Sequence, residues 1–363
     1  MVAKLPISLR LKRFWIRWTQ WEFWPTTIVY LPVLVCYPIW ALLSRDIFFF
    51  SLVNPKMRMG GLYGASKFQG LLPLDAAIKP KTLLFSADAN RAMVESSLNA
   101  AQISFPIIIK PDLGERGKGV EKVVNARQLS RTLPTQTSDF VIQEYLDLPF
   151  EAGVFYIKKP GQTKGAITSI VVKGFLTVKG DGVHTIKELC LMNKRALLIW
   201  EKLEMSLSMD INRILDEGER IDIEPIGNHS RGTAFNDGNH LINPVLEERI
   251  EAMAHSLPEF HYGRFDLRAE SEAQFSLGET IKVMEVNGAN AEPAHIYQEG
   301  ASLWGGFWTL LVYWHTIFLI ARSNRNRFKP SSFAEAHLAY KQWQYIKNEK
   351  WNLAEREVDS ALT

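Results

Sequence analysis

The sequence predicts an α+β protein in which much of the strand pairing is antiparallel. Two pairs of short apolar runs carry this prediction, because each pair is joined by a loop and not by a helix: residues 105–110 with 120–124, and residues 264–268 with 282–286. The apolar share of 47% and the charged share of 22% are those of a folded globular protein. A chain of 363 residues is long enough for two or three packed subdomains.

The first 22 residues form a basic, amphipathic N-terminus. No acidic residue precedes Glu22, whereas the same stretch holds Trp15 and Trp18 among the basic residues Lys4, Arg10, Lys12, Arg13 and Arg17. A basic run with interleaved tryptophans beside an apolar segment suits a membrane surface. The small net charge of +3 does not suggest nucleic acid as a partner.

Two long stretches lack charged residues, namely 23–44 and 300–321. The first is long enough to cross a bilayer, which takes about 20 apolar residues. Three prolines interrupt it and residues 47–55 are apolar again, so we expect residues 23–55 to form a membrane anchor or a re-entrant segment. The tryptophans and His315 of the second stretch suit an interface, and we expect residues 301–322 to form an interfacial helix or a core helix. The alternative for both stretches is a buried core helix.

Between these stretches the chain alternates strands and helices. Residues 60–67 are expected to form a loop, and residues 271–280 a polar loop without apolar periodicity. Further strands are expected at 140–145, 153–157, 168–173 and 174–178. Helices are expected at 87–101, 126–133 after an N-cap at Asn125, 186–202, 244–255 and 333–357.

The segment Phe-Pro-Ile-Ile-Ile-Lys-Pro-Asp-Leu-Gly-Glu-Arg-Gly-Lys-Gly-Val holds three glycines and resembles a phosphate-binding loop. It is not a P-loop, because glycine follows Lys118 where a hydroxyl is required, and a strand follows in place of a helix. It predicts a glycine-rich hairpin loop whose backbone N–H groups can lie over a triphosphate. Lys110, at the end of the preceding strand, would add a positive charge. The alternative is a mobile charged hairpin.

A second group of polar residues is expected on the two late strands. Because strand side chains alternate between faces, Arg264, Asp266 and Arg268 share one face, and Glu285 shares a face with Asn287. Met284 and Val286 would take the opposite face. If the strands pair with the polar faces together, Asp266, Glu285 and Asn287 converge and offer the oxygen ligands that Mg²⁺ prefers. The alternative is the solvated face of a hairpin.

In this order, the motifs resemble the ATP-grasp ligases, the family that includes D-alanine–D-alanine ligase. The resemblance covers roughly residues 70–298. It implies an ATP-grasp fold, in which two α+β subdomains hold ATP between them. Residues 178–195 and 226–238 look like parts of the ATP-grasp domain of cyanophycin synthetase. The segment before residue 105 is shorter than the family's usual N-terminal substrate domain.

The resemblance implies roles for particular residues. Lys110 and the loop residues Gly114, Gly117, Lys118 and Gly119 would cover the phosphates, with Lys173 as a second nucleotide lysine. Glu144 and the backbone of Tyr145 and Leu146 would contact adenine, and Glu151 the ribose hydroxyls. Asp266, Glu285 and Asn287 would bind two Mg²⁺ ions, for which Mn²⁺ can substitute. Catalytic roles would fall to Arg264 at the transferring phosphoryl group and, near the acyl phosphate, to His229, Ser230 and Arg231.

The expected divisions of the chain follow from these assignments. Residues 56–104 would be a short substrate region, 105–172 the lid subdomain, 173–300 the catalytic subdomain and 323–363 a charged helical tail. The implied reaction joins a carboxylate to an amine through an acyl phosphate and releases ADP and phosphate. No nucleophilic cysteine is needed, so Cys190 is expected to be a packing residue.

Because ATP is cytosolic, we expect the catalytic part to face the cytosol, on the cytoplasmic face of a bacterial inner membrane. The expected partners are membrane lipids, a small-molecule or lipid-linked carboxylate and an amine such as an amino acid; a homodimer is left open. Two alternative functions also remain open. One is a kinase that phosphorylates a small molecule or lipid at the same site, and the other is a nucleotide-binding membrane module without turnover.

Overall fold

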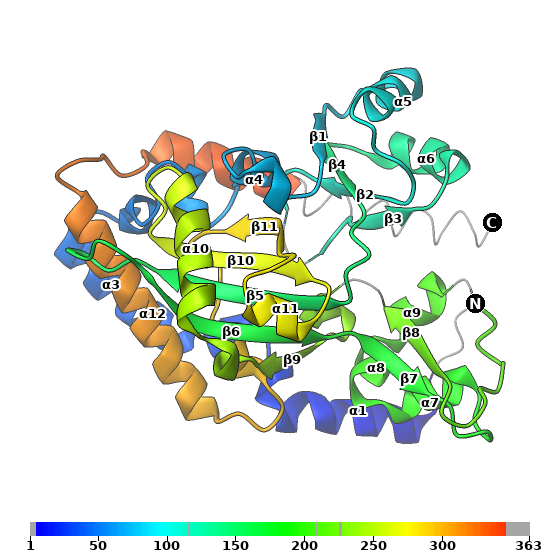
Figure 1. Ribbon diagram of the computed structural model, residues 1–363. Coiled ribbons are helices and arrows are strands. Elements are labelled where there is room, and N and C mark those ends of the chain that lie inside the picture. Colours follow the sequence, from blue (N-terminus) through cyan, green and yellow to red (C-terminus); the bar gives the residue numbers. More distant parts are fainter. Residues whose placement is uncertain (1–4, 115–116, 208, 225–226, 346–363) are drawn as a thin grey trace.

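The computed structural model describes residues 5–114, 117–207, 209–224 and 227–345. Within these residues the protein is built from helices and three antiparallel sheets of five, four and two strands (Figure 1). The prediction of a mixed fold with antiparallel pairing is therefore confirmed.

The five-stranded central sheet has the order β11-β10-β5-β6-β9, with every neighbouring pair antiparallel. Its strands are β5 (Phe150–Ile157), β6 (Ala166–Gly174), β9 (Ala234–Asp237), β10 (Tyr262–Ala269) and β11 (Lys282–Asn287). The helices α10 (Pro244–Ser256) and α11 (Glu272–Ser276) cover one face of this sheet (Figure 1). That face is apolar, because the alternate residues Ala152, Val154, Tyr156, Phe265 and Leu267 point into its core.

The opposite face of the central sheet is divided into a polar part and an apolar part. Phe155, Ile157 and Tyr262 pack in one core with the helices α3 (Leu31–Ser44) and α12 (Leu303–Asn324). Further along the same strands, the residues with the same alternation are Glu151 on β5 and Arg264, Asp266 and Arg268 on β10. The polar cluster and the α3–α12 helices therefore share one face of the sheet.

The four-stranded unit has the order β1-β4-β2-β3. Its strands are β1 (Thr82–Phe85), β2 (Ile107–Pro111), β3 (Glu121–Val123) and β4 (Phe140–Glu144), and its helices are α5 (Arg91–Ala100) and α6 (Ala126–Thr132). Asn125 caps α6, because its side chain accepts a hydrogen bond from the backbone N–H of Gln128 at 2.9 Å. The predicted hairpin β2–β3 and this N-cap are thus confirmed.

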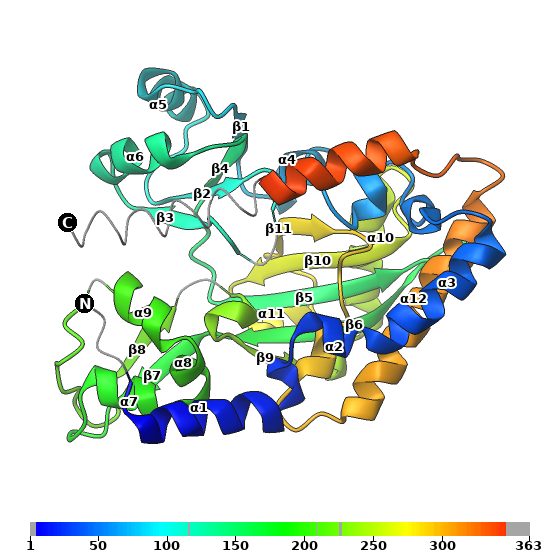
Figure 2. The same ribbon diagram turned by 180° about the vertical axis from the view of Figure 1, so that it is seen from behind.

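The two-stranded unit contains β7 (Leu176–Lys179) and β8 (Arg220–Glu224). Three short helices pack with it: α7 (Ile186–Met192), α8 (Lys194–Leu198) and α9 (Trp200–Ser206). The basic helix α1 (Ile7–Thr19) lies along this unit and contacts α8 (Figure 2). Leu5, Leu9 and Ile16 pack in the core of the unit, and Arg13 forms an ion pair with Glu201.

The sheets divide the chain at points that differ from the expected subdomain boundaries of 105–172 and 173–300. Residues 82–85, expected in the substrate region, form the edge strand β1 of the four-stranded unit by pairing with β4. Residues 150–172, expected in the lid, pair with β10 in the central sheet. The four-stranded unit therefore spans residues 82–144, and the boundary lies between β4 and β5 because β5 finds its partners in β6 and β10.

The first apolar stretch is shorter as a helix than its sequence suggested. It begins with a 3₁₀ turn (Trp21–Phe23), continues as α2 (Thr26–Val29) and ends as the 14-residue α3. The second stretch forms the 22-residue α12, the one helix in the described part of the chain that is long and apolar enough to cross a membrane, by length and composition only. Under half of its most apolar window, 44%, is buried against the protein.

Two further differences concern residues around these elements. The loop expected at 271–280 contains α11, because Ser271 caps a helical turn and Phe275 is buried under it. The expected tail helix is present from residue 333 to residue 345, and residues 346–357 of that prediction lie outside the described part. The remaining short elements are α4 (Lys67–Leu71) and 3₁₀ turns, among them Phe49–Leu52, Arg58–Gly61 and His229–Arg231.

Candidate active site

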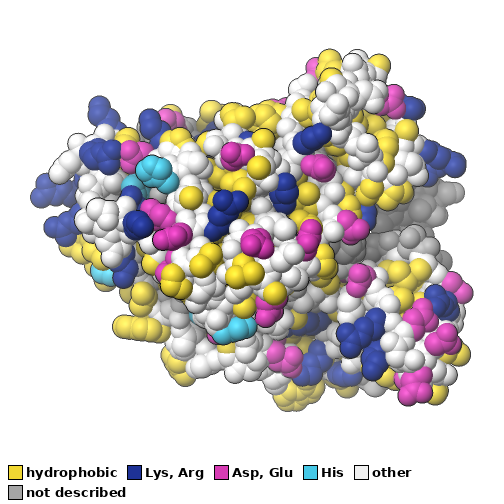
Figure 3. Space-filling view, viewed as in Figure 1, with side chains coloured by type: hydrophobic (Ala, Val, Ile, Leu, Met, Phe, Trp, Pro, Cys, Tyr) yellow, Lys and Arg dark blue, Asp and Glu magenta, His cyan; other side chains and the backbone are white. Residues whose placement is uncertain are grey.

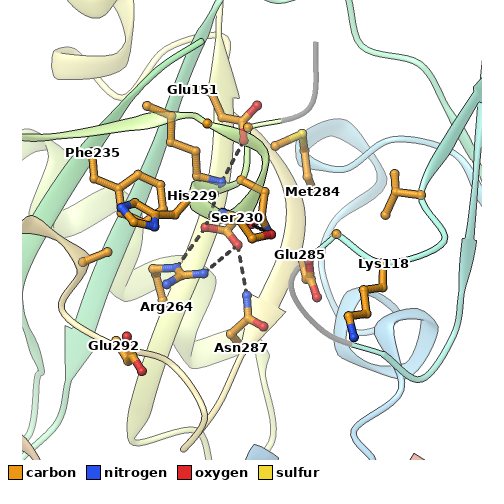
Figure 4. Close-up of a pocket in the computed structure, with 18 of the residues that line it drawn as sticks. Lys118, Glu151, His229, Ser230, Phe235, Arg264, Met284, Glu285, Asn287 and Glu292 are labelled. Atoms are coloured by element: carbon orange, nitrogen blue, oxygen red, sulfur yellow. Dashed lines mark hydrogen bonds and ion pairs between the residues drawn. The ribbon is translucent and has the colours of Figure 1, made fainter. Parts of the chain in front are cut away.

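A cavity of about 550 Å³ lies where the polar part of the central sheet meets the other two units. The four-stranded unit contributes Lys110, Lys118 and Tyr145 to its lining, and the segment after β8 contributes His229 and Ser230. The N-terminal segment contributes further lining residues: Arg17, Glu22, Phe23, Trp24, Thr26 and Val29. Figure 4 shows Lys118, His229 and Ser230 around the polar residues Arg264, Glu285 and Asn287 of β10 and β11.

The strands β10 and β11 bring together the residues predicted to bind metal. Asp266 lies opposite Glu285 in the strand register, and Arg264 lies opposite Asn287. Arg264 donates hydrogen bonds from Nε and Nη2 to the two oxygens of Asp266, at 2.9 and 3.1 Å. Asn287 donates from Nδ2 to Asp266 Oδ2 at 3.0 Å. The predicted convergence of these side chains on one face is what the pairing produces.

The charges around Asp266 keep it ionised. Burial acts to raise the pKa of Asp266, but the Arg264 guanidinium and the Lys173 ammonium outweigh burial and bring the pKa to about 2. Lys173 Nζ lies 3.6 Å from Asp266 Oδ1. Asp266 is therefore a fixed negative charge at the centre of the site.

Glu285 differs from Asp266 in its surroundings. It makes no hydrogen bond or ion pair with the described part of the chain, although its carboxylate contributes to the electrostatic environment of Lys110 and Arg264. It lies half-buried on the cavity wall (Figure 4). Both oxygens of Glu285 thus remain available to a ligand.

A second ion-pair network joins the strands β10, β5 and β6. Glu151 accepts from Lys173 Nζ at 2.8 Å and from Arg268 Nε at 2.9 Å. Burial lowers the pKa of Lys173, but Asp266 and Glu151 outweigh burial, and the net effect raises this pKa. Lys173 is therefore charged and bridges two carboxylates. Glu151, predicted at the ribose, lines the cavity with both of its oxygens engaged in this network.

Lys110 enters the cavity from the end of β2. Its Nζ donates to Gln143 Oε1 at 3.0 Å and lies 3.4 Å from the backbone oxygen of Met284. Burial lowers the pKa of Lys110 to about 8, against the opposite influence of Glu285 and Asp266. Lys110 thus carries a positive charge near neutral pH, and in the described part of the chain no carboxylate pairs with it directly.

The glycine-rich loop lies over the cavity mouth, with residues 115–116 outside the described part. Gly117 and Gly119 have φ angles of +67° and +66°, which L-residues adopt only at a cost. A Cβ at Gly117 would lie 3.3 Å from Asn228 Nδ2, so this loop approaches the segment after β8 across the cavity. Gly114, Gly117 and Lys118 line the cavity, whereas Gly119 turns the chain back toward β3.

The predicted adenine segment follows β4. Glu144, Tyr145 and Leu146 all line the cavity. Glu144 accepts from the backbone N–H of Lys81 at 3.1 Å, and the Leu146 carbonyl accepts from Arg268 at 2.8 Å. The Tyr145 ring lies under Lys122, with Nζ 3.6 Å from the ring centroid. These contacts fix the segment beside the cavity, and the roles at adenine stay predictions.

The three residues predicted near the acyl phosphate do not point in the same direction. His229 lines the cavity and stacks with Phe23 at 5.6 Å between ring centroids. Ser230 lies on the cavity wall (Figure 4) and donates to Asn228 Oδ1 at 2.8 Å. Arg231 pairs with Glu224 at 3.2 Å and does not line the cavity, so the geometry gives no support to its predicted catalytic role.

One sequence expectation about β11 is wrong. Met284 was expected on the face opposite Glu285, but it lines the cavity. The cause is an irregularity in the pairing: Asp266 pairs with Glu285, whereas the next residue, Leu267, pairs with Val283. Met284 is the extra residue of a β-bulge, so the simple alternation fails at this position.

Several lining residues were not singled out from the sequence. Arg268 shares the alternation of Arg264 and Asp266, and this pattern could have identified it as a site residue. Gln143, which holds Lys110, could not be identified because its role arises only from the pairing of β2 with β4. Glu22 is buried, and its Oε2 pairs with Arg195 Nη2 at 2.5 Å and lies 3.2 Å from His229 Nε2. Nothing in the local sequence indicates this long-range contact.

The donor set fits a hard divalent cation. Asp266 and Glu285 place two carboxylates side by side across the strand pair, and the amide of Asn287 adds a third oxygen. Two neighbouring carboxylates repel each other unless a cation lies between them. The described residues contain no group of three or more His, Cys, Asp or Glu side chains that could hold a metal. A cation here would thus need oxygen atoms from a bound substrate as further ligands, as Mg²⁺ takes from nucleotide phosphates.

Three further residues whose side chains can act as ligands or nucleophiles, His184, Cys190 and His295, do not line the cavity. His184 pairs with Asp181 at 2.6 Å on the surface, and His295 Nδ1 lies 2.6 Å from Ser169 Oγ. Cys190 is fully buried in the two-stranded unit, where burial raises the pKa of its thiol to about 11. It is a packing residue, as expected.

The comparison of the sequence with known families and curated proteins gives no match. Solved structures with a likeness to the chain include the D-Ala:D-Ser ligase VanG from Enterococcus faecalis (14% identity, 74% of this chain, 64% of that chain, TM-score 0.39). Another is the D-alanine–D-alanine ligase from Bacillus anthracis (15% identity, 69% of this chain, 63% of that chain, TM-score 0.37).

A third is a bifunctional glutathione synthetase from Pasteurella multocida (16% identity, 64% of this chain, TM-score 0.35). The chain spans 34% of the length of this synthetase and somewhat under two thirds of the two ligases. Since all three TM-scores are below 0.5, the functional proposal below is drawn from the site.

Proposed function

We propose that the protein is an ATP-grasp enzyme: a membrane-associated, ATP-dependent carboxylate–amine ligase. One observation carries the proposal. Asp266, Glu285 and Asn287 converge on one side of a strand pair while Arg264, Lys173 and Lys110 place positive charge around them. A site with a fixed anion, a carboxylate that has no ion-pair partner among the described residues, and three cations suits the transfer of a phosphoryl group, because that reaction needs charge on the phosphates to be neutralised.

The nucleotide would lie between the four-stranded unit and the central sheet. Lys110 and the glycine-rich loop line the same cavity as Glu285. A triphosphate bound against Glu285 would therefore meet Lys110, and the loop could turn its backbone N–H groups toward the phosphate oxygens. The segment 144–146 is held at the other end of this side, where adenine would lie. The engaged oxygens of Glu151 make its proposed contact with ribose depend on an exchange of partners with Lys173 or Arg268.

Asp266, Glu285 and Asn287 would hold Mg²⁺, and the bound cation would supply positive charge that neutralises the nucleotide phosphates. The residues of the chain do the rest of the positioning. Arg264 is fixed by Asp266 in a bidentate pair, so its guanidinium is oriented before any substrate binds. Lys173 is held between two carboxylates and cannot swing away, which keeps a positive charge at the same place throughout turnover.

The proposed reaction has two steps. A carboxylate oxygen of the substrate attacks the γ-phosphorus of ATP, the bond to the β-phosphate oxygen breaks, and ADP leaves with an acyl phosphate formed. An amine then attacks the acyl carbon, phosphate leaves, and the amine gives up a proton as the amide forms. Both steps develop negative charge on oxygens beside Arg264 and the two lysines.

The membrane association is proposed from a set of exposed apolar side chains, called here the apolar face. It comprises Ile7, Leu11, Phe14, Trp15 and Trp18 of α1, Leu31, Leu34, Val35, Ile39 and Leu42 of α3, and Trp304, Trp308, Val312 and Leu319 of α12. On α1 and α3 these residues recur three or four positions apart, and on α12 four or seven positions apart, so that each helix carries one stripe. Arg10, Lys12 and Arg17 accompany the stripe of α1 and suit anionic lipid headgroups.

The structure also favours a position on the membrane surface over a crossing. In α12 the residues between the exposed ones are buried against α3 and the central sheet, so only one side of this helix is free to meet lipid. In Figure 3 hydrophobic side chains protrude along the edge formed by α12, and basic side chains gather at the end of the molecule where this helix ends. We place the protein on the cytoplasmic face of a bacterial inner membrane, where ATP is available, and expect a lipid-linked substrate.

The experiment that tests the ligase proposal follows ADP and phosphate release from Mg·ATP by protein in lipid nanodiscs. The mixture contains a bacterial lipid extract and an amino-acid pool, each omitted in turn, with Glu285→Gln in parallel. Release that needs an amine and a carboxylate, and that the variant lacks, is the expected result. A phosphorylated product formed without any amine would identify a kinase instead, and nucleotide binding without turnover in every mixture would contradict the proposal.

A further inference from the structure

The cavity has a second half, which the nucleotide proposal does not use. Around His229 its lining gathers apolar and aromatic side chains; we call this half the substrate chamber and define it by Phe23, Trp24, Val29, Phe235 and Tyr297. Three of these five residues come from the N-terminal segment, which lies outside the part of the sequence with motifs. The charged residues Glu22, Arg195 and Glu292 also line the cavity, but Glu22 pairs with Arg195, and Glu292 accepts a hydrogen bond from Tyr30. Arg264 and the residues of the chamber line the same cavity.

The N-terminal wall of the chamber is held in place by buried polar contacts at both ends. At one end, Glu22 is buried to 8% exposure and pairs with Arg195 at 2.5 Å and His229 at 3.2 Å. At the other end, the Tyr30 hydroxyl donates to Glu292 Oε1 at 2.6 Å. Trp21 Nε1 also donates to the Ala301 carbonyl at 2.7 Å, which ties the wall to the start of α12. A segment anchored so firmly beside a reaction centre forms a built binding surface.

The wall separates the chamber from the apolar face. Phe23, Trp24, Thr26 and Val29 line the cavity; in the chain, the apolar stripe of α1 ends before them at Trp18 and that of α3 begins after them at Leu31. Figure 2 shows α1, α2 and α3 in succession along one side of the molecule. A molecule that leaves a lipid surface at this side would reach the chamber over the shortest path.

The cavity mouth next to α1 has a positive charge. Arg17 lies in the last turn of α1, is exposed to solvent, and lines the cavity. A guanidinium at this place attracts an anionic head group, and Arg264 at the far end attracts one again. A ligand with a carboxylate and an apolar tail therefore matches the order of charges and apolar walls.

We propose that the substrate chamber binds the apolar part of a carboxylate-bearing amphiphile, with Trp24 as a residue that determines specificity. The inference rests on the proposed function and adds the class of the carboxylate and its binding subsite. With a nucleotide bound, the chamber holds the head and first carbons of the amphiphile, and the rest stays at the membrane.

The test uses straight-chain alkanoates of two to ten carbons as probes, with protein in lipid nanodiscs, Mg²⁺ and a non-hydrolysable ATP analogue. Equilibrium binding is measured against empty nanodiscs of the same lipid, which corrects for partitioning into the bilayer. We expect the dissociation constant to fall about fourfold for each methylene that enters the chamber, the effect of burying one methylene group. In Trp24→Ser this chain-length dependence should largely disappear.

Two further variants make the result specific. Trp24→Phe keeps an aromatic wall but loses the indole donor to the Trp18 carbonyl, so it should retain most of the chain-length dependence. Leu277→Ser removes an exposed apolar side chain remote from the cavity and should behave like the wild type. Loss of the dependence in Trp24→Ser alone would assign the effect to the chamber and not to general damage.

A turnover measurement separates this inference from the ligase proposal. With ATP in place of the analogue, hydroxylamine serves as the amine, so an activated carboxylate yields a hydroxamate with release of phosphate. Chain-length-dependent binding without any hydroxamate would keep the chamber and contradict the ligase. Hydroxamates from small polar carboxylates, with binding that is equal for all alkanoates and unchanged in Trp24→Ser, would keep the ligase and overturn the inference.

Discussion

Asp266 and Glu285 are paired across two strands and yet differ in what they do. Asp266 is almost fully buried, and its oxygens accept hydrogen bonds from Arg264 and Asn287 and form an ion pair with Lys173. Glu285 is half-buried and has no such partners in the described part. Asp266 therefore organises the site, whereas Glu285 is the carboxylate with the most capacity to accept a new ligand. Their substitutions should differ in the same way.

We expect Glu285→Gln to lower the turnover rate by about 100-fold or more while leaving the melting temperature nearly unchanged. The neutral amide of glutamine binds a divalent cation more weakly than a carboxylate does, and the loss of one electrostatic stabiliser typically costs about this much in rate. Among the described residues the side chain has no hydrogen-bond or ion-pair partner whose loss would destabilise the fold. Activity and thermal unfolding of the purified variant, beside the exposed control Glu279→Gln, check both parts. A variant as active as the control would contradict the role of Glu285.

We expect Asp266→Asn to abolish activity and also to destabilise the protein, by about 3–5 kcal/mol. Removing one partner of a buried ion pair leaves the other, here Arg264, uncompensated. Denaturant unfolding of the variant measures the cost. A stability equal to that of Glu285→Gln would show that the Arg264–Asp266 pair is not the buried network described here.

Lys110 gives the site a pH dependence. Its pKa in the folded protein is about 8, below the ordinary 10.5, so the unfolded chain binds more protons between these values and stability rises with pH from about 8 to 10.5. Nucleotide binding should respond in the opposite direction, because neutral Lys110 no longer attracts phosphate. We expect the dissociation constant for ATP to increase as pH rises above about 8.

The matched variant for this prediction is Lys110→Arg, which keeps its charge throughout the range. Its ATP affinity should be nearly constant from pH 7.5 to 9.5, about the range in which Lys110 loses its proton. ATP binding by calorimetry at several pH values decides the matter. The same slope in wild type and variant would place the titrating group elsewhere.

At the residue scale, sequence reasoning worked where geometry is periodic. The two-residue alternation of strands was enough to place Arg264, Asp266, Glu285 and Asn287 on one face. It failed for Met284, because a bulge depends on how two strands pair and not on either strand alone. It also could not find Gln143 or Glu22, whose contacts with Lys110 and Arg195 join distant parts of the chain.

At the scale of elements, the helix α1 has two apolar sides. Leu9 and Ile16, together with Leu5 just before the helix, pack on the two-stranded unit, and the stripe from Ile7 to Trp18 faces outward. The sequence indicated the basic charge and the tryptophans of this helix. It did not indicate that the helix is already packed on the protein, because two apolar stripes on one helix are distinguished only when a partner covers one of them.

We expect Trp15→Glu with Trp18→Glu to weaken binding to vesicles of anionic phospholipid by about tenfold or more, since two interfacial aromatic side chains are replaced by charges that anionic headgroups repel. Both residues are exposed, so the melting temperature should stay the same. Vesicle co-sedimentation measures binding. Met192→Glu, at an exposed site on α7, serves as the control for added charge. Equal binding of all three proteins would contradict the role of the α1 stripe.

Among the elements, the apolar helices had the lengths that were hardest to predict from the sequence. Composition favoured the first stretch as the membrane-crossing one, but its prolines divide it into α2 and α3, and the longer helix is α12. Burial of one side of α12 depends on the central sheet, which lies far away in the sequence. The strand β1 was missed for a similar reason, since it is a strand only through its pairing with β4.

At the scale of the whole molecule, one face of the central sheet joins chemistry to the membrane side. Arg264 and Asp266 lie on β10 with Tyr262 two residues away, and Tyr262 packs in the core that contains α3 and α12. The N-terminal segment connects the same two regions by lining the cavity. The fold therefore places the proposed ligase site and the apolar face on one continuous side of the protein.

We expect Mg·ATP to stabilise the folded protein, by about 2.7 kcal/mol at a concentration 100 times its dissociation constant. The gain should vanish when EDTA removes the metal, because ATP alone would bring its charge against Asp266 and Glu285. Thermal unfolding with ATP, with Mg²⁺, and with both gives the comparison. Equal stabilisation with and without metal would contradict the proposed cation site.

The most direct test of the central claim is isotope transfer from the substrate carboxylate to phosphate. The carboxylate that supports the fastest ADP release is labelled with ¹⁸O in both oxygens, and the phosphate formed with an amine present is examined by mass spectrometry. Activation through an acyl phosphate predicts one ¹⁸O atom in each phosphate released. Unlabelled phosphate, formed at the same rate as ADP, would show that water and not the carboxylate attacks ATP, and would contradict the ligase account.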